Sequence, residues 1–313
     1  MGLTNFPNGI TSFGIPIMGS NRFSNPWSTH YFVNGDVGAS GGGLTPGTAF
    51  KTIQEAVTAM TGGDVVYIKP KTYTMGTGFA RYEEDVVVAN TGASSAATAP
   101  LAGKSIIGVT PNTVASDFLG VRWKYATNTN LNVEAPGTHI ENIGFFCEGA
   151  TAGVYFEGDG ATWTKGGHTG SSLYNCAIKG EGGVLANGSD SLQIINCQFQ
   201  AKWDGDTCGM IITLDGTNVN RRPVLRGCHF IGGNGTSMNS APIIWTGKVE
   251  DGLIADNYFH TGTTVQINIA TASSSGLIVN NFFAEANLST TFIVQNGMSV
   301  VNAMDVGGVE ASP

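Results

Sequence analysis

Apolar and polar positions recur in a six-residue pattern through the second half of the chain. The pattern occurs six times, with starts 21 to 33 residues apart, as IENIGF (140–145), LYNCAI (173–178), IINCQF (194–199), LRGCHF (225–230), IADNYF (254–259) and IVNNFF (278–283). Position one is always Ile or Leu, and position six is Phe in five copies and Ile in one. Positions four and six share the parity of one strand face, whereas positions one and six do not. The two-residue period must therefore break inside the pattern.

Position three explains the break, because it holds Asn, Asp or Gly, the residues that best tolerate a left-handed backbone. Each copy is then strand, one-residue bend and strand, and its repetition indicates the coils of a parallel β-solenoid. We expect two interior columns of side chains. One, at position four, consists of Ile143, Cys176, Cys197, Cys228, Asn257 and Asn281, with the Asn amides bonding from coil to coil. The other, at position six, is an aromatic column of Phe145, Phe199, Phe230, Phe259 and Phe283.

One short helix is predicted before the coils. Apolar residues at helical spacing in AFKTIQEAVTAMT indicate a helix over 49–61, with Thr48 or Thr45 as its cap and Gly62–Gly63 as its end. Such a helix would cover the N-terminal end of the hydrophobic stack, as solenoids require. Strands are expected at 65–68, 104–109 and 121–125, so the coils span about 64–300 of a β-helix domain at 30–313.

Residues 1–29 are predicted to form an extended arm. The arm has Pro7, Pro16 and Pro26, shows no sustained period, and is nevertheless rich in large apolar residues. Because a disordered tail is poor in such residues, the arm should dock, either on its own domain or on a partner chain.

Composition and charge exclude several classes of function. The 313 residues include 45 Gly, only 12% are charged, and the net charge of −8 argues against a nucleic-acid-binding protein. No apolar run reaches the length of about 18 residues that a membrane span needs. Five cysteines, without a CxxC pair, favour buried thiols over disulfides or zinc, and we expect no metal and no cofactor.

Candidate catalytic groups are few. Paired carboxylates for glycoside hydrolysis could come from Asp204 with Asp206, from Asp215, or from Glu157 with Asp159. Asp204 and Asp206, however, stand in a Gly-flanked turn that favours Asp for local reasons. The five histidines share no metal-ligand spacing. We therefore expect no catalytic residues.

The segment from Tyr31 to Tyr73, with YFVNG, LTPGTAFKTIQEAV and GDVVYIKPKTY, is similar to the entry region of pectate-lyase-like β-helix proteins. The hexapeptides extend this similarity over most of the chain. The resemblance implies an all-β fold, a single-stranded right-handed parallel β-helix with a short N-terminal capping helix, and often carbohydrate binding or cleavage. RRPVLR (221–226) fits the R-x-P-x-x-R pattern of pectate lyases, but Arg226 is an outward position two, and the polygalacturonase-like NTDG, DD and GHG motifs are absent.

LTNFPNGITSFGIP (3–16) resembles the opening of structural proteins of tailed-bacteriophage particles, in particular a head-associated family. This resemblance implies a non-enzymatic capsid decoration or cement protein, a homotrimer that docks on the major capsid protein and stabilises the head. The start MGLTNFPNG lacks the features of a signal peptide, so the protein would be made in the host cytoplasm and reside on the virion. The expected anchor residues are Leu3, Phe6, Pro7, Asn8, Gly9, Ile10, Phe13, Gly14, Ile15 and Pro16.

Two other functions remain open from the sequence. One is a tailspike-like protein that binds or cleaves a host surface polysaccharide, although 313 residues leave little room for the additional domains of a spike. The other is a free polysaccharide lyase, which the missing motifs disfavour.

Overall fold

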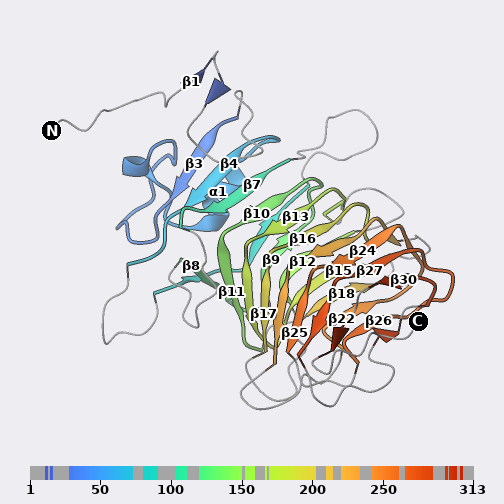
Figure 1. The fold of residues 1–313 in the computed structure, drawn as a ribbon. Helices are drawn as coiled ribbons and strands as arrows, with labels where there is room; N and C mark the ends of the chain where they lie inside the picture. The colour runs from blue at the N-terminus through green and yellow to red at the C-terminus, as the bar shows by residue number, and fades with distance from the viewer. Residues whose placement is uncertain are drawn as a thin grey trace.

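A computed structural model of the chain describes residues 11–12, 15–16, 28–72, 80–90, 103–110, 120–149, 152–158, 166–167, 169–201, 209–213, 220–232, 241–260, 265–284, 293–294, 296–301 and 304–305. Most of the described strands belong to three long parallel sheets that are visited in turn by each coil, so the chain is an all-β parallel β-helix. In Figure 1 the colours follow one another along the stack, because each coil lies on the one before it in sequence.

Sheet 1 has ten strands, and it contains position one of every hexapeptide. Its strands, in spatial order, are β3 (His30–Val33), β4 (Val65–Ile68), β7 (Ser105–Gly108), β10 (His139–Glu141), β13 (Ser172–Tyr174), β16 (Gln193–Ile195), β20 (Val224–Arg226), β24 (Gly252–Ala255), β27 (Gly276–Val279) and β30 (Ser299–Val301).

Sheet 2 has nine strands, and it contains position six. Its strands are β5 (Tyr82–Glu83), β8 (Val121–Lys124), β11 (Ile143–Cys147), β14 (Ala177–Gly180), β17 (Gln198–Gln200), β21 (His229–Ile231), β25 (Tyr258–His260), β28 (Phe282–Phe283) and β31 (Met304–Asp305).

Sheet 3 has eight strands and closes each coil. Its strands are β6 (Val86–Val88), β9 (Thr129–Val133), β12 (Ala152–Phe156), β15 (Val184–Asn187), β18 (Met210–Thr213), β22 (Ile243–Trp245), β26 (Ile267–Ile269) and β29 (Ile293–Val294). A parallel pair, β19 (Asn220–Arg221) and β23 (Val249–Glu250), precedes two strands of sheet 1.

The bend between sheets 1 and 2 has the backbone that the sequence predicts. Position three has a positive φ in all six copies, and these residues are Asn142, Asn175, Asn196, Gly227, Asp256 and Asn280. The one-residue left-handed bend forms the corner between the two sheets and shifts the in-out alternation of side chains by one residue. The odd-numbered first position and the even-numbered sixth position therefore both point inward. All residues at positions one and six are fully buried.

The aromatic column forms as predicted and continues without interruption through four coils. The ring centroids of Phe199, Phe230, Phe259 and Phe283 are 4.7, 4.9 and 4.8 Å apart in succession, with nearly parallel planes. This spacing equals the distance between hydrogen-bonded strands, so exact register across coils stacks the rings directly. Stacking of this kind adds about 0.5–1.5 kcal/mol per pair to the area that the rings bury.

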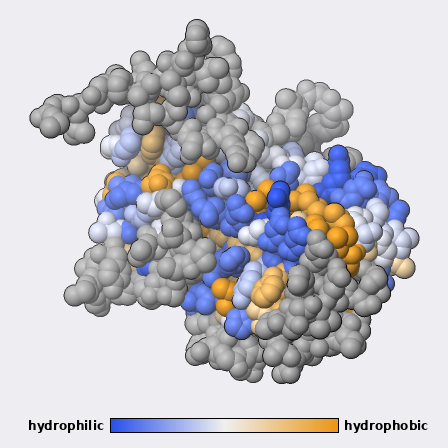
Figure 2. Space-filling view, viewed as in Figure 1, coloured by the Kyte–Doolittle hydropathy of each residue, from blue (hydrophilic) through white to orange (hydrophobic). Residues whose placement is uncertain are grey.

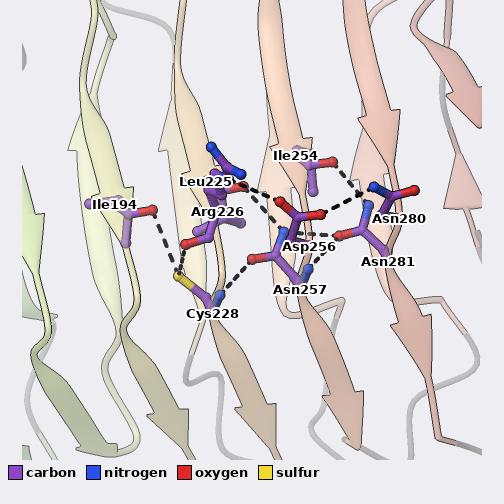
Figure 3. A network of polar contacts seen from close by, with 9 residues as sticks. All are labelled: Ile194, Leu225, Arg226, Cys228, Ile254, Asp256, Asn257, Asn280 and Asn281. Atoms are coloured by element: carbon purple, nitrogen blue, oxygen red, sulfur yellow. Dashed lines mark hydrogen bonds and ion pairs between the residues drawn. The ribbon is translucent and has the colours of Figure 1, made fainter.

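The position-four column is also interior, and its Asn amides bond between coils as predicted. Asn257 Nδ2 donates to Asn281 Oδ1 at 2.9 Å, and Asn257 Oδ1 accepts from the backbone N–H of Cys228 at 2.8 Å (Figure 3). Earlier coils hold Cys176, Cys197 and Cys228 at the same place, and the thiol of Cys228 receives the Cys197 N–H at 3.4 Å. Buried thiols and amides therefore satisfy backbone groups at this corner.

The predicted helix is present but shorter, and its predicted cap is wrong. Helix α1 is Ile53–Ala59, and Thr52 caps it in a capping box with Glu55. Thr45 instead caps a 3₁₀ turn, η1 (Pro46–Thr48). The reason is that Phe50 pairs with Val33 beside sheet 1, which keeps this part of the chain out of the helix until Thr52.

Helix α1 lies at the N-terminal end of the stack, where it contacts β3, β4 and β6. Its buried face consists of Ile53, Ala56 and Val57. The carboxylate of Glu84 accepts the backbone N–H groups of Ile53 and Gln54 at 3.0 and 3.1 Å, which joins the helix to the segment between β5 and β6. Burial raises the pKa of Glu84 above its ordinary value, although these bonds oppose the shift.

Candidate functional site

Two short strands mark the only part of the predicted arm whose backbone is described before residue 28. Strands β1 (Thr11–Ser12) and β2 (Ile15–Pro16) form an antiparallel pair in a two-stranded sheet of their own. Of the predicted anchor residues, Ile15 and Pro16 belong to β2. The others, which are Leu3, Phe6, Pro7, Asn8, Gly9, Ile10, Phe13 and Gly14, lie outside the described residues. The division at residue 29 and the anchor residues stay predictions.

The candidate carboxylates are not brought together in the described part of the chain. Asp159, Asp204, Asp206 and Asp215 lie outside it. Glu157 follows β12 and accepts a hydrogen bond from Asn132 Nδ2 at 2.8 Å across the adjacent coil. Glu157 therefore links two adjacent coils of sheet 3.

The arginine pattern of 221–226 lies on the outer surface, and its arginines form ion pairs with acidic residues of adjacent coils. Arg226 Nε is 2.9 Å from Asp256 Oδ2, and Arg221 Nε is 3.7 Å from Glu250. Between them, Arg222 is 2.7 Å from Asp190. Cross-coil pairing accounts for these arginines without a bound substrate.

A cluster that the sequence did not reveal lies on the outer face of β10 and β13. His139 Nδ1 is 2.8 Å from the Ser172 hydroxyl, and its Nε2 is 3.2 Å from Glu141. The distances suit a nucleophile, a base and an orienting acid. However, the backbone N–H groups of His139 and Ser172 both donate to the preceding coil, so neither is available to stabilise an oxyanion. The cluster can be found in sequence only by following the residue before each hexapeptide, where His139 and Ser172 align.

An exposed aromatic column lies on the outer face of sheet 2, at position five of the hexapeptides. His229, Tyr258 and Phe282 are in register on β21, β25 and β28, with ring centroids 5.6 and 5.4 Å apart. Tyr258 and Phe282 are 36% and 41% exposed. The rings of Tyr258 and Phe282 stack on each other, whereas the ring of His229 is tilted by 43° against Tyr258.

The cysteines at position four have no features of a reactive or metal-binding site. Burial raises the pKa of the Cys176 and Cys228 thiols well above the ordinary value, which keeps them protonated. Within the described ranges, no three His, Cys, Asp or Glu side chains are arranged to hold a metal ion. No helix within these same ranges has the length and apolarity of a membrane span.

Comparison with solved structures gives a likeness in fold. The chain is similar in fold to the crystal structure of pectate lyase Pel9A. The identity is 14% and the TM-score 0.41, over 90% of this chain and 78% of that one. No family model matches the sequence, and no curated protein matches it. The parallel β-helix follows from the strand pairing of this chain itself, and no activity is transferred from the lyase.

Proposed function

We propose that this protein is a non-enzymatic structural protein of a tailed-bacteriophage particle, which decorates the head by docking its N-terminal arm on the major capsid protein. The observation that carries the proposal is the arm itself: an apolar, Pro-containing segment whose sequence resembles that of head-associated proteins, and whose described strands β1 and β2 pair only with each other.

The energetics of the arm suit attachment to a repeating surface. Apolar side chains such as Phe6, Ile10, Phe13 and Ile15 stabilise a contact by about 25 cal/mol for each Å² removed from water. Pro7 and Pro16 restrict the unbound arm and so reduce the entropy lost on docking. If the protein carries several arms, as the predicted homotrimer would, weak contacts combine through effective concentration.

Binding to isolated capsids tests the proposal. The double variant Phe6→Ser/Phe13→Ser should lose saturable, lattice-like binding of the full chain. Leu44→Ser is the matched control, because Leu44 is an apolar side chain that is 59% exposed in the β-helix domain. Wild-type protein that does not bind capsids, or a double variant that binds as well as the control, would overturn the proposal.

The exposed aromatic column favours one second candidate, a tailspike-like protein that binds or cleaves a host surface polysaccharide. His229, Tyr258 and Phe282 offer an apolar edge to a sugar chain laid across the coils. A host polysaccharide should then be retained or shortened by wild-type protein and not by Tyr258→Ser. Equal retention by both proteins, or none by either, would remove this candidate.

A further inference from the structure

The outer face of sheet 1 changes character along the stack. On β10 and β13 it is polar, with His139, Glu141 and Ser172 bonded to one another. From β16 to β30 its outward positions are mainly aliphatic, and these residues are Ile195, Val224, Leu253, Leu277, Val279 and Val301. We call these six residues the aliphatic face. Figure 2 shows a run of hydrophobic residues in the region where Figure 1 places β24 and β27.

The aliphatic face is regular and exposed to water. Val224, Leu253 and Leu277 are in register on three successive strands, and so are Val279 and Val301 on the last two. Leu277 is 36% and Val301 44% exposed. Flat, β-branched and leucine-rich sheet faces of this kind normally pack against another sheet at about 10 Å.

Charged residues border the aliphatic face in a definite pattern. Arg222 and Arg226 stand at the two ends of β20, whereas Asp251 and Asp256 stand at the corresponding ends of β24, one coil further on. The side chains of Arg222 and Arg226 are 61% and 60% exposed, so they can reach a second partner beyond their own coil neighbours (Figure 3, for Arg226 and Asp256). The centre of the face therefore lies between a positive coil and a negative coil.

This pattern is complementary to itself under one particular rotation. A two-fold axis along the strands, between β20 and β24, keeps the strand direction and reverses the order of the coils. It places Arg222 opposite Asp251 of the second copy, and Arg226 opposite Ala255, one residue before Asp256. It also places Val224 opposite Leu253 and Ile195 opposite Val279, so these four apolar positions match. At the margin of the overlap, Leu277 faces Gln193 and Val301 faces Tyr174.

The alternative arrangements bring like charges together. A two-fold axis along the stack faces Arg222 with Arg226 of the same coil, and Asp251 with Asp256. A three-fold axis along the stack places each coil beside the same coil of the neighbouring copy. The arginine-bearing coils of the copies then again lie next to one another. Like charges placed opposite each other cost several kcal/mol at an interface.

We propose that the aliphatic face is where a second copy of this chain docks, with its stack antiparallel, to form a two-fold symmetric dimer. An isologous interface needs a self-complementary patch, which this face supplies. Four strands of this face, β16 to β27, overlap under the rotation, and spacings of about 4.8 Å between strands and about 3.3 Å between residues give a footprint of about 19 by 10 Å. A stable interface buries about 800 Å² per partner, so the aliphatic face is its centre and the charged ends of the coils complete it.

The proposal stands independently of the arm and competes with the trimer that the phage resemblance implies. The first test is the mass of the full chain in solution, by light scattering on a size-exclusion column. Wild-type protein should have about twice the 32.5 kDa of one chain. Leu277→Asp should be monomeric, whereas Val87→Asp, on an exposed position of β6 in sheet 3, should remain dimeric. A wild-type monomer, a trimer or a dimeric Leu277→Asp would overturn the proposal.

Cysteine cross-linking tests the orientation separately. The antiparallel dimer sets Leu277 opposite Gln193 of the second copy, since β27 and β16 are equally distant from the axis. In a Cys208→Ser background, Leu277→Cys should not cross-link to itself but should cross-link when mixed with Gln193→Cys. Efficient self-cross-linking of Leu277→Cys would place equal coils at equal heights and contradict the antiparallel arrangement. Circular dichroism of each variant, with the β-sheet signal of the wild type, ensures that the β-helix is intact.

Discussion

The interior amide of Asn257 gives the most direct test of how the coils are held together. Its Oδ1 accepts the backbone N–H of Cys228 at 2.8 Å. Its Nδ2 donates to Asn281 Oδ1 at 2.9 Å and to the Leu225 carbonyl at 3.2 Å. Asn257 is 1% exposed, so water cannot replace these partners. The substitution Asn257→Leu keeps the approximate volume and removes all three bonds.

The expected loss of stability follows from these contacts. A buried N–H without an acceptor, here that of Cys228, costs about 1–3 kcal/mol. Each of the other two lost bonds contributes about 0.5–1.5 kcal/mol. The leucine side chain regains about 1 kcal/mol through its additional apolar surface. The net destabilisation should therefore be about 1–5 kcal/mol, a large part of the 5–15 kcal/mol typical of a folded protein.

Urea unfolding followed by circular dichroism measures the effect, with Asn257→Cys as the matched control. Cysteine occupies this position in three earlier coils, and a thiol there accepts a backbone N–H in the case of Cys228. Asn257→Cys should therefore lose clearly less stability than Asn257→Leu. Equal losses for the two variants, or a loss under about 1 kcal/mol for Asn257→Leu, would refute the idea that the amide satisfies otherwise orphaned backbone groups.

Three further predictions concern other parts of the stack. In the same urea assay, Phe230→Ala should lower the free energy of unfolding by about 3–5 kcal/mol and Tyr258→Ala by less than about 1 kcal/mol, because only Phe230 is fully buried. Similar losses for the two variants would contradict the interior position of the aromatic column at position six. The thiols of Cys176 and Cys228 should resist a maleimide in native protein and react in urea, as mass spectrometry can show, and rapid native labelling would contradict their burial. Because burial raises the folded pKa of Glu84, the contribution of this carboxyl is fully present at low pH and falls as the pH rises through the folded pKa. Wild type should thus lose stability relative to Glu84→Gln as the pH rises above the ordinary pKa of a glutamate, and a pH-independent difference would refute this.

The coils were predictable because their inward positions obey a local code. The residue at position three must adopt a positive φ, which restricts it to Asn, Asp or Gly, and this restriction is visible in sequence at Asn142, Asp256 and Asn280. The apolar requirement at positions one and six is equally local. Burial and backbone geometry thus leave a signature that one sequence can show without any relative for comparison.

The helix cap and the polar cluster were not predictable for the opposite reason. Thr45, Thr48 and Thr52 are all acceptable caps, and only the pairing of Phe50 with Val33, 17 residues earlier, selects Thr52. His139 and Ser172 are 33 residues apart and meet only because their coils are in register. Contacts made across coils depend on loop lengths, which the local pattern does not contain.

The outward positions of the coils are the part of the β-helix free to acquire a function. Positions two and five point away from the interior of the β-helix, and the six copies differ most at these places. Position five runs from Gly144 and Ala177 to His229, Tyr258 and Phe282 along sheet 2. Since this aromatic column and the aliphatic face of sheet 1 both lie outside the interior of the β-helix, contacts beyond a single chain explain both surfaces better. Substitutions there should change association while leaving the unfolding of the monomer nearly unaltered.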